Sequence, residues 1–581
     1  MPFTMFKINL FFAFFNLYGI CFLLAQAPST NGIVNKYSNT KTLYFKNAFY
    51  LLALKANTPQ PIKNKIALIS VRKFSENLYI IDSSLIHNII LNNIYVEKLL
   101  NANNNWKLSS AAEILLANKY DSLQQYHFQI LCRKIEFIDR LLKLHKELSK
   151  DIFILREQNL LSAICTIKQI KNLFLNEDEV IGIDVLLSKP KEELGVPGFD
   201  LSANKINLVH NQYPFINGQG KHVSVKEDFY DTTDIDIKGR HEYSSSASTS
   251  ITNHANFMAT IIAGAGNSIY YARGVAREAI LSSSSFEQVL PDADSNYLHR
   301  NITVQNHSYG TDLENNYGLS AVAFDKSAQN NQGLLHVFSS GNSGNKTSTS
   351  GNYTGIAGFA NLTGNFKMAK NILVVGAVDS FGNVAPLSSS GPAYDGRIKP
   401  ELVAFQKNGT SEAAALVSGT ALLLQQYYSN LHPQNILPSA LAKAILINAA
   451  DDIEAPGPDF KTGYGNLNAL KAMSLLRDNN IFSGNIRQDS TQTFSISIPN
   501  NIALLKVTLA WNDTAASPMA NKALVNDVDL QVTLPANNLS WLPWVLNTSA
   551  NIDSLNKFAV RKKDSLNNVE QVTIENPLPG N

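Results

Sequence analysis

Apolar residues recur at helical spacing from about residue 106 to residue 175, with few glycines or prolines to interrupt them. Such spacing predicts a helical segment. Pro190 and Pro197 then break the pattern, together with nearby glycines, which indicates a linker or the approach to a new domain. We therefore expect a helical N-terminal region over residues 28–195.

Short apolar runs rich in β-branched residues alternate with helical stretches between about residues 200 and 478. The runs HVSV, NITVQ, GLLHVFSS and NILVVGAV predict strands, whereas GTSEAAALVSGTALLLQQYY predicts a helix. This alternation is typical of an α/β domain in which helices wrap a mostly parallel sheet. We place that domain at residues 196–480 and expect its functional groups at the carboxyl ends of the strands.

After about residue 482 the pattern changes to alternating polar and apolar residues, as in TQTFSISI, LLKVTLAW and VDLQVTL. This alternation, with turn-forming residues between the runs, predicts an all-β, jelly-roll-like sandwich over residues 481–581. The pattern calls for one more strand after VTIENPLPGN. We therefore expect this domain to be truncated at its C-terminus.

The N-terminus carries Lys7, an apolar run over residues 8–24 and the small residues Ala25 and Ala27. This order predicts a signal peptide over residues 1–27 and thus a secreted, cell-surface or periplasmic protein. An uncleaved anchor is the alternative, but the run is slightly short for a bilayer span. We expect no stable insertion into a membrane.

Charge and cysteine content narrow the function classes further. The formal net charge is +2, from 49 Lys and Arg against 47 Asp and Glu, so no strong field would attract nucleic acid. Outside the apolar run only Cys132 and Cys165 remain, too few for a disulfide framework. Two buried thiols are expected, with a single bridge as the alternative.

The loop Gly409-Thr410-Ser411 opens a long, nearly all-apolar helix. A serine at a helix N-terminus sits where free N–H groups and the helix dipole favour a developing negative charge. A plain N-cap serine is the commoner explanation. Hydrolysis of an amide through a serine also requires a base, a group that orients the base, and donors for the oxyanion.

Two stretches supply that context. SSSGPAYDGRIKPELVAF, over residues 388–405, and HANFMATIIAG, which begins at His254, closely resemble blocks of the subtilisin-like serine protease family. The resemblance implies that Ser411 is the nucleophile and His254 the general base. HVFSSGNSG is similar to the family segment whose asparagine donates to the oxyanion, which assigns that role to Asn342.

VQNHSYG resembles the family strand that pairs with the substrate backbone, which places Ser308, Tyr309 and Gly310 along the cleft. His307 beside them is expected to be a local polar contact. Here the chain departs from the family at the acid, because HVSVKEDFYD puts Glu227 where an aspartate is usual, with Asp228 next to it. Neighbouring strand side chains point to opposite faces, so one of the two can reach the histidine, and the register favours Glu227. Other departures from the family are Asn256, Phe257, Glu412, Ala415 and Leu416.

The chain is thus expected to be a secreted serine endopeptidase that cleaves polypeptides through an acyl-enzyme and requires no cofactor. Two alternatives stay open: a catalytically inactive binding protein on the same fold at the cell surface, and an adhesive surface protein whose β domain does the work. Residues 28–195 would be either a propeptide that is removed near residue 195 or a permanent binding domain.

A structural calcium ion is the one candidate cofactor. The segment WNDTAASPMANKALVNDVDLQV brings Asp513, Asp527 and Asp529 close together in the sequence, and oxygen-rich loops suit Ca²⁺. The ordinary turn chemistry of Asn and Asp explains the segment equally well.

Overall fold

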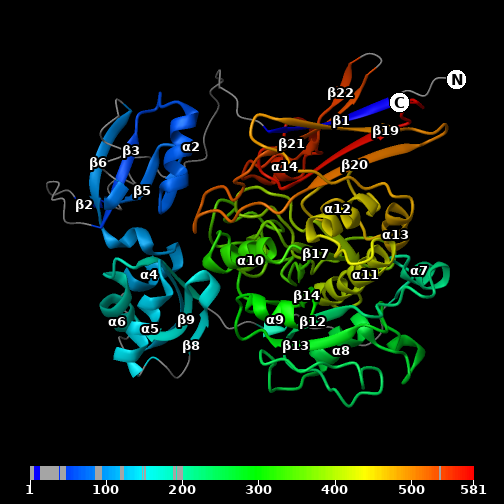
Figure 1. The fold of residues 1–581 in the computed structure, drawn as a ribbon, viewed down its shortest axis with the longest axis horizontal. Helices are drawn as coiled ribbons and strands as arrows, with labels where there is room; N and C mark the ends of the chain where they lie inside the picture. The colour runs from blue at the N-terminus through cyan, green and yellow to red at the C-terminus, as the bar shows by residue number, and fades with distance from the viewer. Residues whose placement is uncertain are drawn as a thin grey trace.

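The computed structural model describes residues 5–12, 38–39, 48–85, 95–117, 124–146, 148, 152–186, 191–192, 200–535 and 538–580. Figure 1 shows three parts: an N-terminal region in blue and cyan, a central part in green and yellow, and a C-terminal β region in orange and red.

The N-terminal region contains two small units that each combine a sheet with helices. The first has the sheet order β2-β6-β3-β5-β4, all antiparallel, and includes helix α2. Its elements are β2 (Ser38–Asn39), β3 (Phe49–Leu54), α2 (Gln60–Ile69), β4 (Arg72–Ser75), β5 (Leu78–Asp82) and β6 (Val96–Ala102).

The second unit has the antiparallel order β10-β7-β9-β8. Its elements are η1 (Asn104–Lys107), α4 (Ser110–Ala117), β7 (Gln125–Cys132), α5 (Ile135–Leu144), β8 (Ile152–Leu155), η3 (Arg156–Gln158), β9 (Leu160–Thr166), α6 (Ile167–Gln169), the π-helical η4 (Ile170–Leu175) and β10 (Val180–Leu186). Cys132 and Cys165 are free and buried, as expected. Burial raises the pKa of each thiol to about 12.

The prediction of a helical segment over residues 106–175 is wrong where the chain forms the strands β7, β8 and β9. The reason is that β7 is covered on both faces: Ile130 packs into the core of this unit, whereas Leu131 packs against Leu319 of the central domain. A strand buried on both faces has a continuous apolar run, which periodicity cannot distinguish from a buried helix.

The central domain is built on a six-stranded sheet of order β13-β12-β14-β16-β17-β18, and every pairing in it is parallel. Its strands are β12 (His222–Glu227), β13 (Ile280–Ser285), β14 (Ile302–His307), β16 (Leu335–Ser339), β17 (Leu373–Val378) and β18 (Leu402–Phe405). The α/β prediction for this part of the chain is confirmed.

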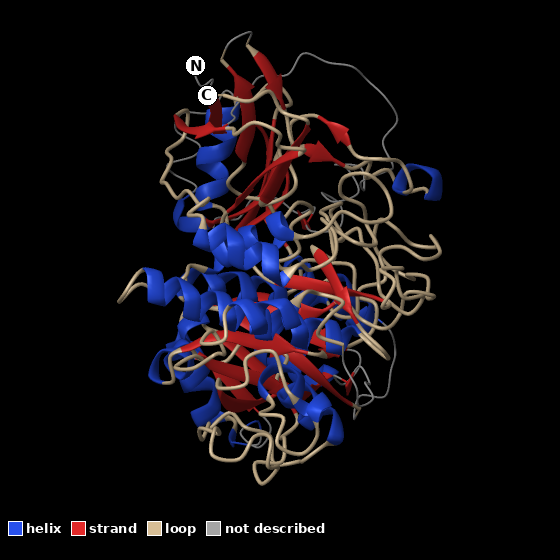
Figure 2. Cartoon of the chain, turned by 90° about the vertical axis from the view of Figure 1, so that its right-hand side faces the viewer, coloured by secondary structure: helices blue, strands red, loops and turns tan. Residues whose placement is uncertain are grey.

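Helices cover both faces of this sheet, as Figure 2 shows. They are α7 (Ile206–Gln212), α8 (Asn253–Ala263), η5 (Tyr270–Ala272), α9 (Asp294–His299), α10 (Leu319–Asn330), η6 (Asn365–Met368), α11 (Thr410–Leu431), α12 (Ser439–Ala449) and α13 (Ala469–Arg477). Adjacent residues of β16 pack on opposite faces of the sheet. Val337 belongs to the core with α8 and α11, whereas Phe338 packs with Phe324 of α10. The domain core therefore lies on both sides of the sheet.

The C-terminal β region contains the sheet β19-β1-β21-β22 and the pairs β20-β25 and β23-β24. Its elements are β19 (Thr491–Ser497), β20 (Leu504–Ala510), β21 (Val528–Leu534), β22 (Leu539–Trp541), β23 (Trp544–Val545), α14 (Ile552–Leu555), β24 (Val560–Arg561) and β25 (Val569–Glu575). The predicted β domain is present, and its jelly-roll topology stays a prediction.

Strand β1 (Met5–Phe12) lies between β19 and β21 and pairs antiparallel with both. It belongs to the segment predicted as a signal peptide, and the rest of residues 1–27 lies outside the described residues. The signal peptide stays a prediction. Among the described residues, no helix has the length and hydrophobicity needed to cross a bilayer.

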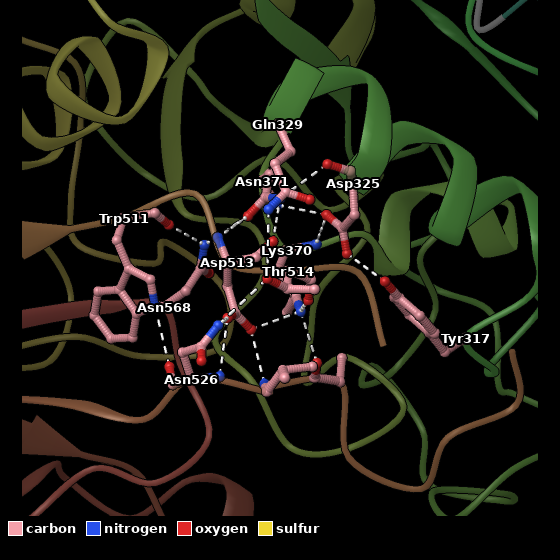
Figure 3. Close-up of polar contacts among 12 residues, drawn as sticks. Tyr317, Asp325, Gln329, Lys370, Asn371, Trp511, Asp513, Thr514, Asn526 and Asn568 are labelled. Carbon is pink, nitrogen blue, oxygen red and sulfur yellow. Dashed lines mark hydrogen bonds and ion pairs between the residues drawn. The ribbon is translucent and has the colours of Figure 1, made fainter. Parts of the chain in front are cut away.

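A buried polar cluster joins the C-terminal β region to the central domain (Figure 3). Lys370 lies 2.7 Å from the Asp513 carboxylate, and both side chains are fully buried. The Lys370 ammonium also donates to the carbonyls of Thr514 at 2.6 Å and Ala523 at 2.7 Å. This ion pair fixes the β region to the loop between η6 and β17.

Candidate active site

The predicted site residues come from different elements that meet at the carboxyl end of the parallel sheet. Glu227 ends β12, Ser308 follows β14, and Asn342 lies three residues after β16. His254 and Ser411 are each the second residue of a helix, α8 and α11. Strands β12, β14 and β16 are neighbours in the sheet, so their ends lie side by side, where α/β folds gather functional groups.

Glu227 and His254 form a buried pair. His254 Nδ1 lies 3.2 Å from Glu227 Oε2, and the two side chains are 2% and 0% exposed. The other carboxylate oxygen accepts a hydrogen bond of 3.0 Å from the backbone N–H of Ser308. Since both oxygens are engaged, the carboxylate is fixed, and Nε2 is the imidazole nitrogen that can take a proton.

Asp228, the fallback for the acid, lies elsewhere. Its side chain is half-buried and accepts a hydrogen bond of 3.0 Å from the Ser248 hydroxyl. The structure thus brings Glu227, and not Asp228, to His254. Strand alternation causes this result, because Glu227 shares a face with Val223 and Val225, which pack into the core that contains α8.

Ser411 is held by the same residue, Ser308, whose backbone N–H holds Glu227. Its hydroxyl donates to the Ser308 carbonyl at 3.3 Å, and the Ser308 hydroxyl donates to the Ser411 carbonyl at 3.3 Å. Ser411 is buried at the start of a 22-residue helix whose N-cap, Gly409, provides no side-chain cap. The N–H groups of this first turn and the helix dipole would favour an anion beside the hydroxyl.

The orientation of Asn342 is set by Thr410. The Asn342 Oδ1 atom accepts hydrogen bonds of 3.0 Å from both the backbone N–H and the hydroxyl of Thr410. This arrangement turns the amide NH₂ group away from Thr410, as a donor to an oxyanion must be. The preceding Gly341 has φ +117°, and a Cβ there would overlap the Thr363 side chain. Glycine is therefore required at this position.

A short strand, β15 (Tyr309–Gly310), lies at the position predicted to pair with a substrate. It pairs antiparallel with β11 (Lys191–Glu192), which precedes the central domain in the chain. The Tyr309 side chain is buried and bonded to His307 at 3.0 Å, so β15 offers its backbone to a partner. His307 stacks on Phe338 at 3.9 Å, and burial lowers its pKa well below the ordinary value, which fits the expected local polar contact.

Two features of the site could not be read from the sequence. The backbone N–H and carbonyl of Ser308 link Glu227 to Ser411. Contacts of backbone atoms leave no signature in residue types. Glu412 accepts hydrogen bonds from the loop before the nucleophile. In the sequence it was visible only as a departure from the residues that the family favours after its nucleophile.

Asp513 does not fit a calcium site. Its carboxylate accepts from Lys370, from the backbone N–H groups of Val525 and Asn526, and from the Asn526 amide. Asp529 is paired with Lys563 at 2.7 Å. The described ranges contain no group of three or more His, Cys, Asp or Glu side chains that could hold a metal ion. Asp513 is thus engaged in an ion pair and hydrogen bonds, and the calcium ion stays a prediction.

The parallel α/β sheet, with an acid, a histidine and a serine at its carboxyl end, is the architecture of a subtilisin-like serine protease. The sequence bears this out independently, since residues 200–465 match the model of the Subtilase family. This part of the chain belongs to that family.

The curated relatives include a serine protease/ABC transporter B family protein of Dictyostelium discoideum, 28% identical over 229 residues. The match covers 34% of this chain and 12% of that protein's length. Among solved structures, the epidermin leader peptide processing serine protease of Staphylococcus aureus has a TM-score of 0.44 and 13% identity, over 62% of this chain and all of that one. The prenylagaramide maturation protease has a TM-score of 0.36 and 20% identity, over 45% of this chain and 97% of that one.

Proposed function

We propose that this chain is a secreted serine endopeptidase that hydrolyses peptide bonds through an acyl-enzyme on Ser411. The observation that carries the proposal is the connected set of contacts at the sheet edge. His254 contacts Glu227, and the backbone N–H and carbonyl of Ser308 hold Glu227 and Ser411 respectively. A plain N-cap serine would need no such neighbours.

In the proposed reaction, Nε2 of His254 takes the proton of the Ser411 hydroxyl as the oxygen attacks the scissile carbonyl carbon. The Asn342 amide and the Ser411 N–H hold the oxyanion, and Glu227 stabilises the imidazolium. His254 then gives its proton to the leaving amine, and the acyl group stays on Ser411. A water molecule, deprotonated by His254, releases the carboxylate product.

Residues 28–195 act as a propeptide in this proposal. The support is the pairing of β11 with β15, which puts the end of the N-terminal region on the strand assigned to the substrate backbone. Cleavage near residue 195 would free that strand. Export through a signal peptide over residues 1–27 belongs to the same proposal, as does a polypeptide substrate.

The test is to express the whole chain for export and to treat it with a fluorophosphonate probe and with casein. Variants Ser411→Ala, His254→Ala and Glu227→Ala run beside the parent, with Asp228→Ala as the matched control. We expect probe labelling to be lost in Ser411→Ala. Casein cleavage should be lost in both Ser411→Ala and His254→Ala, and labelling and cleavage should both fall strongly in Glu227→Ala. Ser411→Ala should also leave the N-terminal region uncleaved.

Two results would reject parts of the proposal. Loss of activity in Asp228→Ala, with Glu227→Ala unharmed, would reject Glu227 as the acid but keep the class of enzyme. A folded parent that neither reacts with the probe nor cleaves casein would favour the catalytically inactive binding protein. An adhesive protein would bind cell-surface polymers equally well without Ser411.

A further inference from the structure

Glu412, the residue after the proposed nucleophile, lies at an unusual point of the first helical turn. With Gly409 as the N-cap of α11, Glu412 occupies the third helical position. A glutamate there normally reaches back to the backbone N–H of the N-cap. The Glu412 carboxylate reaches further, to the backbone N–H of Lys407 at 2.6 Å and of Asn408 at 3.4 Å.

The environment makes these hydrogen bonds strong. Glu412 is 1% exposed, and a hydrogen bond inside a protein is electrostatically stronger than one in water. Gly409 has no side chain with which to cap the helix. The glutamate accepts from backbone N–H groups that precede the helix, and so ties the loop of residues 407–409 to the helix that carries Ser411.

The loop leads directly into the oxyanion side of the site. After Gly409 comes Thr410, whose N–H and hydroxyl both bond to Asn342 Oδ1 and so set the direction of the amide. Displacement of the loop would move Thr410 and turn Asn342, and it would shift Ser411 in the same step.

We propose that Glu412 is a positioning residue, which holds residues 407–409 so that Ser411 and Asn342 keep their relative geometry. This inference rests on the proposed function, because it assigns a role within the same site. In this role Glu412 acts through Thr410 and Asn342. Its hydrogen-bond acceptors matter for this role, whereas its charge does not.

Three variants of the full chain separate these requirements. Glu412→Gln keeps an oxygen to accept from Lys407, so kcat should stay within about threefold of the parent. Glu412→Ala removes the acceptor, and kcat should fall about tenfold to a hundredfold with KM little changed, since small misplacements at a reacting centre cost up to about 10²-fold. The control is Gln425→Ala, which removes hydrogen bonds to Gly333 and Leu437 from the far half of the same helix and should not change kcat.

A double-mutant cycle tests the route through Asn342. If Glu412 acts by orienting that amide, Glu412→Ala should lower kcat much less in an Asn342→Ala background than in the parent. Hydrogen exchange provides a readout that does not depend on activity. The amides of Lys407 and Asn408 should exchange faster in Glu412→Ala, and near the parent rate in Glu412→Gln.

The outcomes are distinguishable. A parent that reacts with the probe, together with an equally fast Glu412→Ala, would overturn the inference and leave the proposed function standing. Equal loss in Glu412→Ala and Glu412→Gln, or unchanged exchange at residues 407 and 408, would also overturn it. A folded parent without any reaction would remove the proposed function, and the catalytic part of this inference with it.

Discussion

Lys370 offers a sharp test of how the C-terminal β region is held. Its ammonium makes three contacts inside the protein: the Asp513 carboxylate at 2.7 Å and the carbonyls of Thr514 and Ala523. Neither charged side chain is exposed. Replacement by methionine keeps most of the volume but leaves a buried carboxylate without its cation.

The structure indicates the size of the effect. Removal of one partner from a buried ion pair destabilises a protein by about 3–5 kcal/mol. The two orphaned carbonyls would add a cost, whereas the three N–H donors that remain on Asp513 reduce it. For Lys370→Met we therefore expect a loss of about 4 kcal/mol in the free energy of unfolding.

The assay is denaturant unfolding of the full chain in a Ser411→Ala background, which prevents self-digestion. Lys522→Met is the matched control, because Lys522 is 43% exposed and lies 3.9 Å from Asp527, so its loss should cost less than about 1 kcal/mol. Adding Asp513→Asn to Lys370→Met should restore part of the stability, because no buried charge is left. Equal small losses for Lys370→Met and Lys522→Met would refute the reasoning.

Two further predictions concern pH and backbone geometry. Desolvation by burial raises the pKa of Glu314 from 4.5 to about 7, and the charge of the Asp184 carboxylate adds to this increase. Between those values the unfolded chain has lost a proton that the folded chain keeps, so this group lowers stability as pH rises from about 4.5 to 7, by up to about 3 kcal/mol. Unfolding of Glu314→Gln should lack this contribution, and identical pH profiles would contradict it. Gly341→Ala should lower the free energy of unfolding by about 1–3 kcal/mol, because of the positive φ of this residue and the overlap with Thr363. It should also lower kcat by displacing Asn342. An unaltered melting temperature and kcat would speak against this prediction.

The central domain could be predicted because its local signals agree with its long-range structure. Its strands are short, apolar and separated by helices, and a parallel sheet with both faces covered requires that pattern. The face of Glu227 was also predictable: Val223 and Val225 precede it at spacings of two and pack toward α8, so strand alternation points Glu227 to the side of His254. Lys226 points to the other face and pairs with Asp292 at 2.9 Å.

The N-terminal region and the ion pair of Asp513 show where local patterns carry too little information. The strands β7 and β9 have apolar runs because the central domain covers them, and that contact joins residues more than 150 positions apart, such as Leu131 and Leu319. Asp513 looked like a ligand because its sequence neighbours are Asn and Asp. Its partner, Lys370, lies 143 positions earlier in the chain, and no local pattern records that pairing.

The order of strands in space explains why the site could be identified residue by residue but not assembled from the sequence. Along the chain β13 follows β12, yet in the sheet β12 has β13 on one side and β14 on the other. The second neighbour places Ser308 next to Glu227, so that one residue donates its backbone N–H to Glu227 and accepts from the Ser411 hydroxyl at its carbonyl. Residue types predict the acid, the base and the nucleophile, whereas the contact that joins Glu227 and Ser411 is the backbone of Ser308, whose position depends on the sheet order. A substitution at position 308 that preserves this backbone should therefore keep both backbone hydrogen bonds, but it would lose the contact of the Ser308 hydroxyl with the Ser411 carbonyl.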